Sequence, residues 1–239
     1  MAMTPRALVV QHEEKAPPGL LVPWLEQAGL ECDVLPAHEG YAVPADLGDH
    51  AALVVLGGSM DAWDDGAYRW LLPTRALIAG TVSSGRAFLG VCLGHQLAAL
   101  ALGGAVGRQP GGQTTGLHPW RPTREGLADP FTSALQPGTE VLHFNSDAVT
   151  ALPPGATLLA GDEDGTVQAA RYGPLAWGVQ FHPEVDDVLV QGWATGRRPE
   201  AEDATVRVLR QRQAELHPAW EQLIHRFGLL ATTPQAQPA

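Results

Sequence analysis

Cysteine is scarce in this chain: Cys32 and Cys92 are the only two among 239 residues. Two cysteines are too few for the disulfide framework that stabilises small secreted domains, so we expect a cytoplasmic protein. The N-terminal stretch contains only a short apolar run and soon turns acidic, which does not fit a signal peptide. No apolar run approaches the roughly 20 residues that a membrane-spanning helix needs.

Basic side chains are also few. Lys and Arg together number 15 against 26 Asp and Glu, which gives a net charge of −11. Proteins that bind nucleic acid or an anionic membrane present a basic surface, so the composition argues against both partners. The P-loop pattern G-x-x-x-x-G-K-[S/T] is missing as well. Asp61, Asp64 and Asp65 lie close together, but their spacing and the lack of a nearby histidine favour a solvated loop over a metal site.

Apolar residues, by contrast, are plentiful at 45%, enough for one sizeable core. In the first half of the chain, short apolar runs alternate with helix-length stretches. The expected strands are Ala7–Gln11, Glu31–Leu35, Ala51–Leu56 and Ala87–Val91. The expected helices are Leu20–Ala28, Tyr68–Ser83 (with Pro73 as a kink or a new start) and Gly94–Leu102. This alternation with short links predicts an α/β fold with an open, mostly parallel central sheet flanked by helices.

The pattern changes after about Val106, where shorter β-like pieces are separated by Pro and Gly turns. These pieces predict antiparallel strands laid on the parallel core, at Leu117–Pro122, Glu140–Phe144, Thr157–Ala160, Val167–Arg171 and Ala176–Phe181. Two helices are expected to follow, Asp186–Thr195 and Ala201–Phe227. Since no linker or repeat interrupts the chain, we expect one domain over residues 1–231 and a disordered tail at 232–239.

Cys92 lies in the segment Gly90-Val91-Cys92-Leu93-Gly94, between an apolar strand and an apolar-faced helix. This is the G-x-nucleophile-x-G pattern of a tight strand-to-helix turn. Glycines on either side let the neighbouring backbone pass, and the N-terminus of the following helix favours a thiolate. The alternative is a buried core cysteine, which is common. Cys32 has no such glycines and is interpreted as core filler.

His182 and Glu184 are candidates for the base that a thiol nucleophile needs and for the group that orients it. Both follow the expected strand Ala176–Phe181, and Pro183 favours extended geometry at His182. Residues i and i+2 of an extended chain point the same way, so the two side chains share a face. The alternative is a strand-end histidine beside a solvated acid, and His-Pro-Glu alone does not decide between them.

The segments GVCLGHQ (90–96) and GVQFHPE (178–184) together resemble the class I glutamine amidotransferases. The resemblance extends over the whole chain, including the Gly-Gly turn at 57–58 and the LPPGA turn at 152–156. Within the family, the chain is most similar in style to free-standing members and to the glutaminase domain of GMP synthetase. The resemblance implies a flavodoxin-like open sheet with Cys92 as nucleophile, His182 as base and Glu184 as its orienter.

The resemblance also implies an oxyanion hole and a substrate pocket. Backbone N–H groups of Gly58 and Leu93 would form the hole, and the residue after an elbow nucleophile is the usual donor. Gln96 would contact the amino-acid head group, and His143–Asp147 would line the pocket. Ser59, Asn145 and Asp147 are also expected substrate contacts. Ser59 stands where many relatives have proline, and Asn145-Ser146-Asp147 where many have His-Gly-Asp, so the pocket is expected to be tuned differently.

The implied activity is hydrolysis of a glutamine side-chain amide through a Cys92 thioester, releasing ammonia and glutamate. The two-step acyl transfer requires no metal or redox cofactor. No synthetase domain follows the motifs, so ammonia would pass to a separate synthetase subunit. Two alternatives remain: a stand-alone hydrolase of gamma-glutamyl conjugates with the same triad, and a non-catalytic binding protein that retains the fold.

Overall fold

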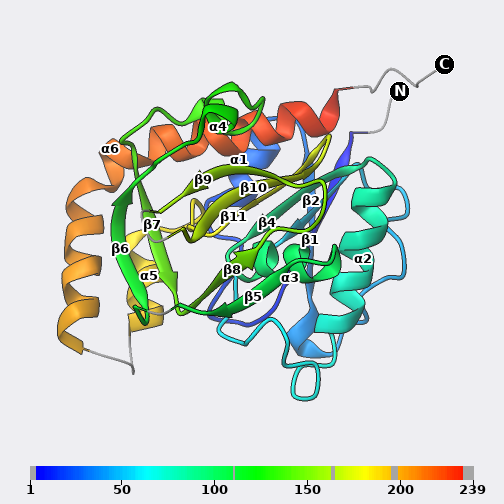
Figure 1. The fold of residues 1–239 in the computed structure, drawn as a ribbon, viewed down its shortest axis with the longest axis horizontal. Coiled ribbons are helices and arrows are strands. Elements are labelled where there is room, and N and C mark those ends of the chain that lie inside the picture. The colour runs from blue at the N-terminus through cyan, green and yellow to red at the C-terminus, as the bar shows by residue number, and fades with distance from the viewer. Residues whose placement is uncertain (1–3, 110, 163–164, 195–198, 234–239) are drawn as a thin grey trace.

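The central feature of the fold is a mixed β-sheet with helices on both faces (Figure 1). The computed structural model describes residues 4–109, 111–162, 165–194 and 199–233, and the side chains of 199–203 are not described. Within these ranges, nine strands form one sheet in the order β2-β1-β3-β4-β11-β10-β8-β5, with β9 paired to β10. The sheet strands are β1 (Arg6–Gln11), β2 (Glu31–Pro36), β3 (Ala52–Val55), β4 (Ala87–Val91), β5 (Ala105–Arg108), β8 (Asp147–Ala151), β9 (Thr157–Gly161), β10 (Val167–Gly173) and β11 (Ala176–Val179).

One half of this sheet is parallel, as the sequence predicts. Strand β1 pairs in parallel with β2 and β3, β3 with β4, and β4 with β11. The carboxyl ends of parallel strands meet at one edge, where open α/β sheets bind ligands. The segments that follow β4 and β11 carry Cys92 and His182, so the topology brings the two motifs together.

The antiparallel section mostly extends the sheet and does not lie on it as predicted. Strand β10 is antiparallel to β11, β9 and β8, and β8 is antiparallel to β5. Only β6 (Thr114–Pro119) and β7 (Glu140–Asn145) form a separate two-stranded sheet within the described residues. Strands β5 and β8 were not predicted, because β5 contains Gly107 and a terminal Arg108 and β8 follows β7 after a single residue.

The helices cover the sheet in two layers, each with its own apolar core. Helices α1 (Leu21–Gln27) and α6 (Pro199–Thr232) lie on one face, and α2 (Leu71–Ser83) and α3 (Leu93–Ala101) on the other. Strand β1 shows why both layers are needed: Ala7 and Val9 point into the first core, while Leu8 and Val10 point into the second. A strand buried on both faces reads as a continuous apolar run, which is the observed pattern.

Helix boundaries differ from the predicted ones at a few points. Helix α2 begins at Leu71, so Pro73 lies in its first turn, where the missing N–H costs nothing. Helix α5 (Asp187–Ala194) matches the prediction, whose last residue, Thr195, lies outside the described residues. Helix α6 is longer than predicted and runs past Phe227 to Thr232, with Pro218 in its interior. Residues 234–239 of the predicted tail also lie outside the described residues.

A short helix, α4 (Arg124–Ala128), was not predicted from the sequence. Its N-cap is Thr123, whose hydroxyl accepts a hydrogen bond from the Gly126 N–H.

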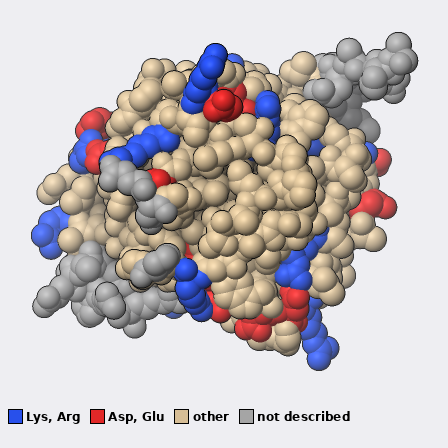
Figure 2. Space-filling model, viewed as in Figure 1, with Lys and Arg blue, Asp and Glu red and all other residues tan. Residues whose placement is uncertain are grey.

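On the face shown in Figure 2, acidic and basic side chains lie mostly along the rim and the centre is largely uncharged. Among the described residues, no helix is long and apolar enough to cross a membrane.

Candidate active site

Cys92 occupies a strained turn between β4 and α3. Its φ is +50° and its ψ is −103°, and it is the one non-glycine residue with a positive φ in the described part of the chain. The Cys92 N–H donates to the Val179 carbonyl at 2.8 Å, which ties the turn to β11. Positive φ costs a residue with a Cβ of order 1–3 kcal/mol and persists where the surroundings impose it. The turn therefore holds the thiol at the sheet edge.

The flanking glycines explain how such a turn fits against the sheet. A Cβ on Gly94 would lie 2.0 Å from the Val55 carbonyl oxygen, and one on Gly90 would lie 2.6 Å from the Gly94 carbonyl. Both distances are far below van der Waals contact, so each position accepts glycine alone. The spacing of the two glycines is therefore a requirement of the turn and not a compositional accident.

His182 and Glu184 lie together next to this turn. His182 Nδ1 is 2.7 Å from Glu184 Oε1, so that an Nδ1–H donates to the carboxylate. Both side chains are buried, and the His182 N–H donates to the Leu142 carbonyl at 2.8 Å. The backbone carbonyl of Glu184 accepts from the Leu20 N–H at 2.9 Å. The pair is thus anchored through the backbone at both residues.

The charge environment of His182 differs from that of the other buried histidines. Burial alone lowers its pKa, but the negative charges of Glu184 and Cys92 and the hydrogen bonds to them outweigh burial and raise the pKa to about 10. Burial without such partners lowers the pKa values of His12, His95 and His143 to about 3. Of these four buried histidines, His182 is therefore the one positioned to carry a proton at neutral pH.

The turn at residues 57–59 lies against the nucleophile. A Cβ on Gly57 would lie 2.9 Å from His182 Cε1 and 3.6 Å from Cys92 Cβ, so the backbone packs directly on both residues. The backbone N–H groups of Gly58 and Leu93 have no hydrogen-bond acceptor among the described residues. Two unengaged N–H groups beside a nucleophile are what an oxyanion hole requires.

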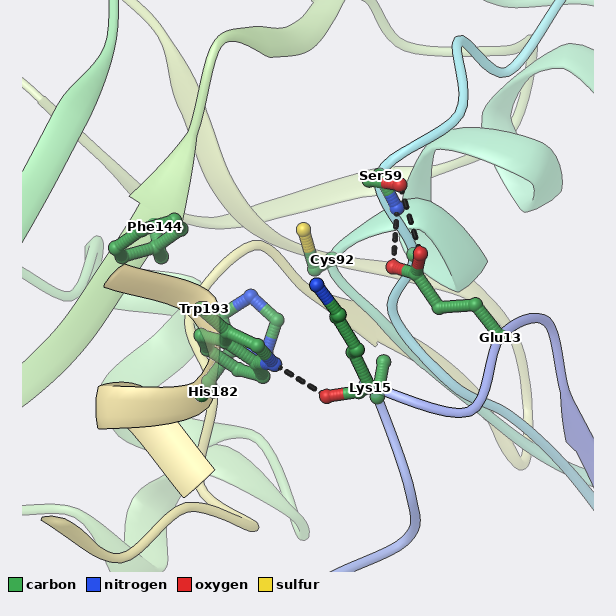
Figure 3. A pocket seen from close by; sticks show the side chains of 10 residues that line it. Glu13, Lys15, Ser59, Cys92, Phe144, His182 and Trp193 are labelled. Atoms are coloured by element: carbon green, nitrogen blue, oxygen red, sulfur yellow. Dashed lines mark hydrogen bonds between the residues drawn. The ribbon is translucent and has the colours of Figure 1, made fainter. Parts of the chain in front are cut away.

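Ser59 fixes this turn to the loop after β1. The two carboxylate oxygens of Glu13 accept hydrogen bonds from the Ser59 N–H at 2.7 Å and from its hydroxyl at 2.8 Å. Figure 3 shows the paired bonds, which proline at position 59 could not make because it lacks an N–H. Sequence reasoning treated Ser59 as a substrate contact and did not find Glu13.

Gln180 is a second residue that the sequence analysis missed. Its side chain is fully buried, and Nε2 donates to Cys92 Sγ at 3.5 Å. The signal was available, because the i, i+2 argument that places Glu184 beside His182 also places Gln180 on that face. Gln180 Oε1 in turn accepts from Gln96 Nε2 at 3.2 Å.

Two cavities meet at Cys92. The larger, of about 440 Å³, is lined by Glu13, Lys15, Ala16, Gly58, Ser59, Cys92, Phe144, His182, Gly192 and Trp193 (Figure 3). The smaller, of about 220 Å³, is lined by Gly58, Ser59, Met60, Asp61, Cys92, Gln96, Arg108, Gln113, Phe144, Asn145, Ser146 and Asp147. Cys92 lines both cavities, so each of them is adjacent to the candidate nucleophile.

The smaller cavity gathers the remaining predicted substrate contacts. Gln96 and Asn145 each donate from their side-chain amides to the Asp147 carbonyl, at 2.9 and 3.0 Å. Asn145 Oδ1 is buried and has no partner among the described residues. Arg108 pairs with Asp147 at 2.9 Å and with Asp61 at 2.8 Å. The wall thus offers a buried amide oxygen, carboxylates and a guanidinium.

Some predicted features lie outside both cavities. Cys32 is partly buried against the first core, where burial, with Glu26 and Asp33, raises its thiol pKa to about 12. Asp65 pairs with Arg75 at 2.5 Å, so the acidic loop is partly held by arginines and not simply solvated. Within the described residues, no cluster of three or more His, Cys, Asp or Glu is arranged to hold a metal ion.

Comparison with protein families and curated proteins gives a consistent result. The family model for glutamine amidotransferase class-I matches residues 20–188. The glutamine amidotransferase-like protein YfeJ of Salmonella typhimurium is 30% identical over 218 residues, which cover 90% of each chain. GMP synthase of Pyrobaculum aerophilum is 31% identical, over 67% of this chain and 29% of that protein. Gamma-glutamyl peptidase 5 of Arabidopsis thaliana is 30% identical, over 61% of this chain and 58% of that protein.

Solved structures share the fold. The crystal structure of a glutamine amidotransferase from Thermotoga maritima superposes with a TM-score of 0.81 at 25% identity, covering 95% of this chain and 99% of that one. This similarity confirms the predicted fold class. The chain spans nearly the full length of this structure and of YfeJ, but only 29% of the GMP synthase and 58% of the peptidase.

Proposed function

The chain belongs to the class I glutamine amidotransferase family, and we propose that it hydrolyses the side-chain amide of glutamine or of a closely related gamma-glutamyl compound through a thioester on Cys92. The observation that carries the proposal is the 2.7 Å contact between His182 and Glu184 in the same site as the strained Cys92 turn. A buried, charged histidine beside a thiol matches the requirements of nucleophilic acyl transfer. We assign the roles of nucleophile, base and orienter to Cys92, His182 and Glu184 in that order.

In the first step, the Cys92 thiolate attacks the side-chain amide carbon. Negative charge develops on the carbonyl oxygen, where the N–H groups of Gly58 and Leu93 would receive it. One such donor contributes roughly 10²–10³-fold to a rate. His182, protonated through its raised pKa, gives its proton to the departing nitrogen as the C–N bond breaks. Ammonia leaves, and the gamma-glutamyl group remains on the sulfur.

In the second step, His182 accepts a proton from a water molecule that attacks the thioester. The products are glutamate and the regenerated Cys92 thiolate. Glu184 holds the imidazole through Nδ1, which leaves Nε2 to exchange protons with substrate and water. Gln180, which donates to the sulfur at 3.5 Å, supports the thiolate between turnovers.

The smaller cavity is our candidate for the glutamyl head group. An α-ammonium would find the unpartnered Asn145 Oδ1 and the Asp147 carboxylate, and an α-carboxylate would find Arg108. Burial raises the pKa of Asp147 while Arg108 lowers it, so the two side chains are electrostatically linked. Gln96 donates hydrogen bonds to the Asp147 carbonyl and to Gln180, and Gln180 donates to Cys92, so this wall is connected to the nucleophile.

Two further candidates follow from the relatives. GMP synthase is named as glutamine-hydrolysing and only 29% of it is matched by this chain, which supports a synthetase partner that receives the ammonia. Gamma-glutamyl peptidase 5 supports a stand-alone hydrolase of gamma-glutamyl conjugates, and the larger cavity beside Cys92 favours this candidate specifically. A non-catalytic binding protein has no structural observation in its favour, because it would not need a strained nucleophile turn.

The proposed function is tested by incubating the purified protein with glutamine and with a panel of gamma-glutamyl amides. We expect glutamate to appear in equal amount to ammonia or to the released amine. The measurement is an enzyme-coupled assay of glutamate together with detection of the amine. If no member of the panel is hydrolysed and a glutamine-analogue alkylator leaves Cys92 unmodified, the proposal is wrong and the binding protein becomes the better account.

A further inference from the structure

The larger cavity is much bigger than the hydrolysis of free glutamine needs. The leaving group of glutamine is ammonia, which is close in size to a water molecule, and one water molecule needs only about 10–15 Å³ of such cavity volume. The larger cavity measures about 440 Å³, whereas the smaller, more polar cavity, which Cys92 also lines, measures about 220 Å³. If the glutamyl head group occupies the smaller cavity, the larger one faces the departing nitrogen with room for several more atoms.

The lining of the larger cavity combines an apolar wall with one free cation. Trp193, Phe144 and Gly192 form part of the wall, and Phe144 and Trp193 are in ring contact at 5.4 Å between centroids. Lys15, the only lysine of the chain, extends into the cavity toward Cys92 (Figure 3). Its ammonium group has no hydrogen-bond or ion-pair partner in the part of the chain that the structure describes.

Glu13, the acidic residue in this wall, forms no ion pair with Lys15 among the described residues. Both carboxylate oxygens of Glu13 are engaged by the Ser59 N–H and hydroxyl. An unpaired cation beside aromatic surface fits a ligand that is apolar in its middle and anionic at its end. Ammonia offers Lys15 nothing to bind, because it has no negative charge.

The loop between β1 and α1, which carries Lys15, is fixed by hydrogen bonds at three places. Trp193 Nε1 donates to the Lys15 carbonyl at 2.6 Å, which joins the loop to α5. The Glu13–Ser59 hydrogen bonds join it to the turn at residues 57–59, and the Leu20 N–H donates to the Glu184 carbonyl. A wall held at three points is preorganised, so binding there orders little new structure.

We propose that the larger cavity is a leaving-group subsite and that Lys15 binds a carboxylate on the amine side of the scissile bond. The substrate class is a gamma-glutamyl amide of an amino acid or a short peptide. The inference rests on the proposed function, since it uses the same Cys92 chemistry and adds the identity of the leaving group. A substituent packed on Trp193 and a carboxylate paired with Lys15 distinguish this substrate from glutamine.

The chemistry of this substrate balances without any further reactant. The Cys92 thiolate bonds to the gamma carbonyl carbon, the C–N bond breaks, and the nitrogen leaves with the proton of His182 as the free amine of an amino acid. Water then cleaves the thioester, giving glutamate and restoring the thiolate. The net reaction is addition of one water across the gamma-glutamyl amide bond.

The test compares kcat/KM for gamma-glutamyl-alanine with that for the same compound carrying a C-terminal carboxamide. The two substrates differ by one negative charge at the position assigned to Lys15. Because the pair is partly solvated, we expect the acid to be preferred about tenfold, an effect of about 1.4 kcal/mol. Lys15→Met should reduce this ratio to about one, and Lys15→Arg should keep most of it.

Arg124→Met is the matched control. Arg124 is exposed on α4, outside the lining of both cavities, and the variant removes the same charge from the protein. It should leave the ratio near ten. An unchanged ratio in Lys15→Met, with both substrates slowed in parallel, would show that Lys15 acts on the shared chemistry and would overturn the proposal.

The remaining outcomes separate this inference from the function on which it rests. If glutamine is hydrolysed in a Cys92-dependent way but neither dipeptide is, the leaving-group subsite is wrong and the proposed function stands. If no substrate shows Cys92-dependent hydrolysis, the proposed function fails and the inference fails with it. A preference for the acid that high salt does not weaken would also contradict an ion pair at Lys15.

Discussion

Cys92→Ala is expected to lower kcat/KM for the best gamma-glutamyl substrate by at least about 10⁴-fold, because no other group can form the thioester. The thiol is held at the sheet edge by a backbone with φ of +50°, and Gln180 donates to its sulfur at 3.5 Å. Alanine removes the sulfur and retains the Cβ that the turn already accommodates. The variant should therefore fold like the wild type, which circular dichroism and thermal melting check alongside the coupled glutamate assay.

Cys32→Ala is the matched control for this variant. Cys32 is partly buried in β2, and burial raises its pKa to about 12, so it is a poor nucleophile at neutral pH. We expect the control to keep its activity within about twofold of the wild type. If activity survived in Cys92→Ala and disappeared in Cys32→Ala, Cys32 and not Cys92 would be the nucleophile, and the proposed assignment would be wrong.

Glu184→Gln is expected to lower kcat/KM by roughly 10²–10⁴-fold, the usual range when a base loses its charge partner. Glutamine keeps the size of the side chain but removes the negative charge 2.7 Å from His182 Nδ1. That charge is a main reason why the pKa of His182 rises to about 10 in spite of burial. Without it, burial pulls the His182 pKa down, and the proton needed by the leaving nitrogen is lost.

The raised pKa of His182 also predicts how the free energy of unfolding changes with pH, and the same variant tests this prediction. A histidine whose pKa is raised in the folded protein stabilises the fold fully below its unfolded value of 6.5, and this contribution is lost as pH rises toward about 10. Wild-type stability should therefore fall across this window, whereas Glu184→Gln should lose much of this dependence. NMR titration of the His182 ring measures the pKa directly, with Glu14→Gln on the exposed loop as control. An unshifted His182 pKa in Glu184→Gln would contradict the assigned pairing.

Much of the fold could be predicted from the sequence because apolar runs report burial on both faces of a sheet. Ala87–Val91 is the clearest example, since each residue of β4 is buried and the predicted bounds match the observed ones. The strands beyond β11 were harder to predict from the sequence. Strands such as β5 and β8 are partly exposed, so their sequences carry no continuous apolar pattern.

The site could be predicted where local geometry determines it. Gly90 and Gly94 mark the turn because no Cβ fits there, and the i, i+2 spacing places Glu184 beside His182. Glu13 and Lys15 could not be found in this way. They lie far in sequence from both motifs, and they reach the site only because the loop after β1 folds against Ser59 and Trp193.

Intact-protein mass spectrometry of acid-quenched reactions tests the central claim most directly. The protein is mixed with excess gamma-glutamyl substrate, quenched within the first turnovers and digested to locate any adduct. We predict the added mass of one gamma-glutamyl group on the peptide that carries Cys92. Substrate turnover with no adduct on Cys92 under any quench time, or an adduct on another residue, would contradict the account.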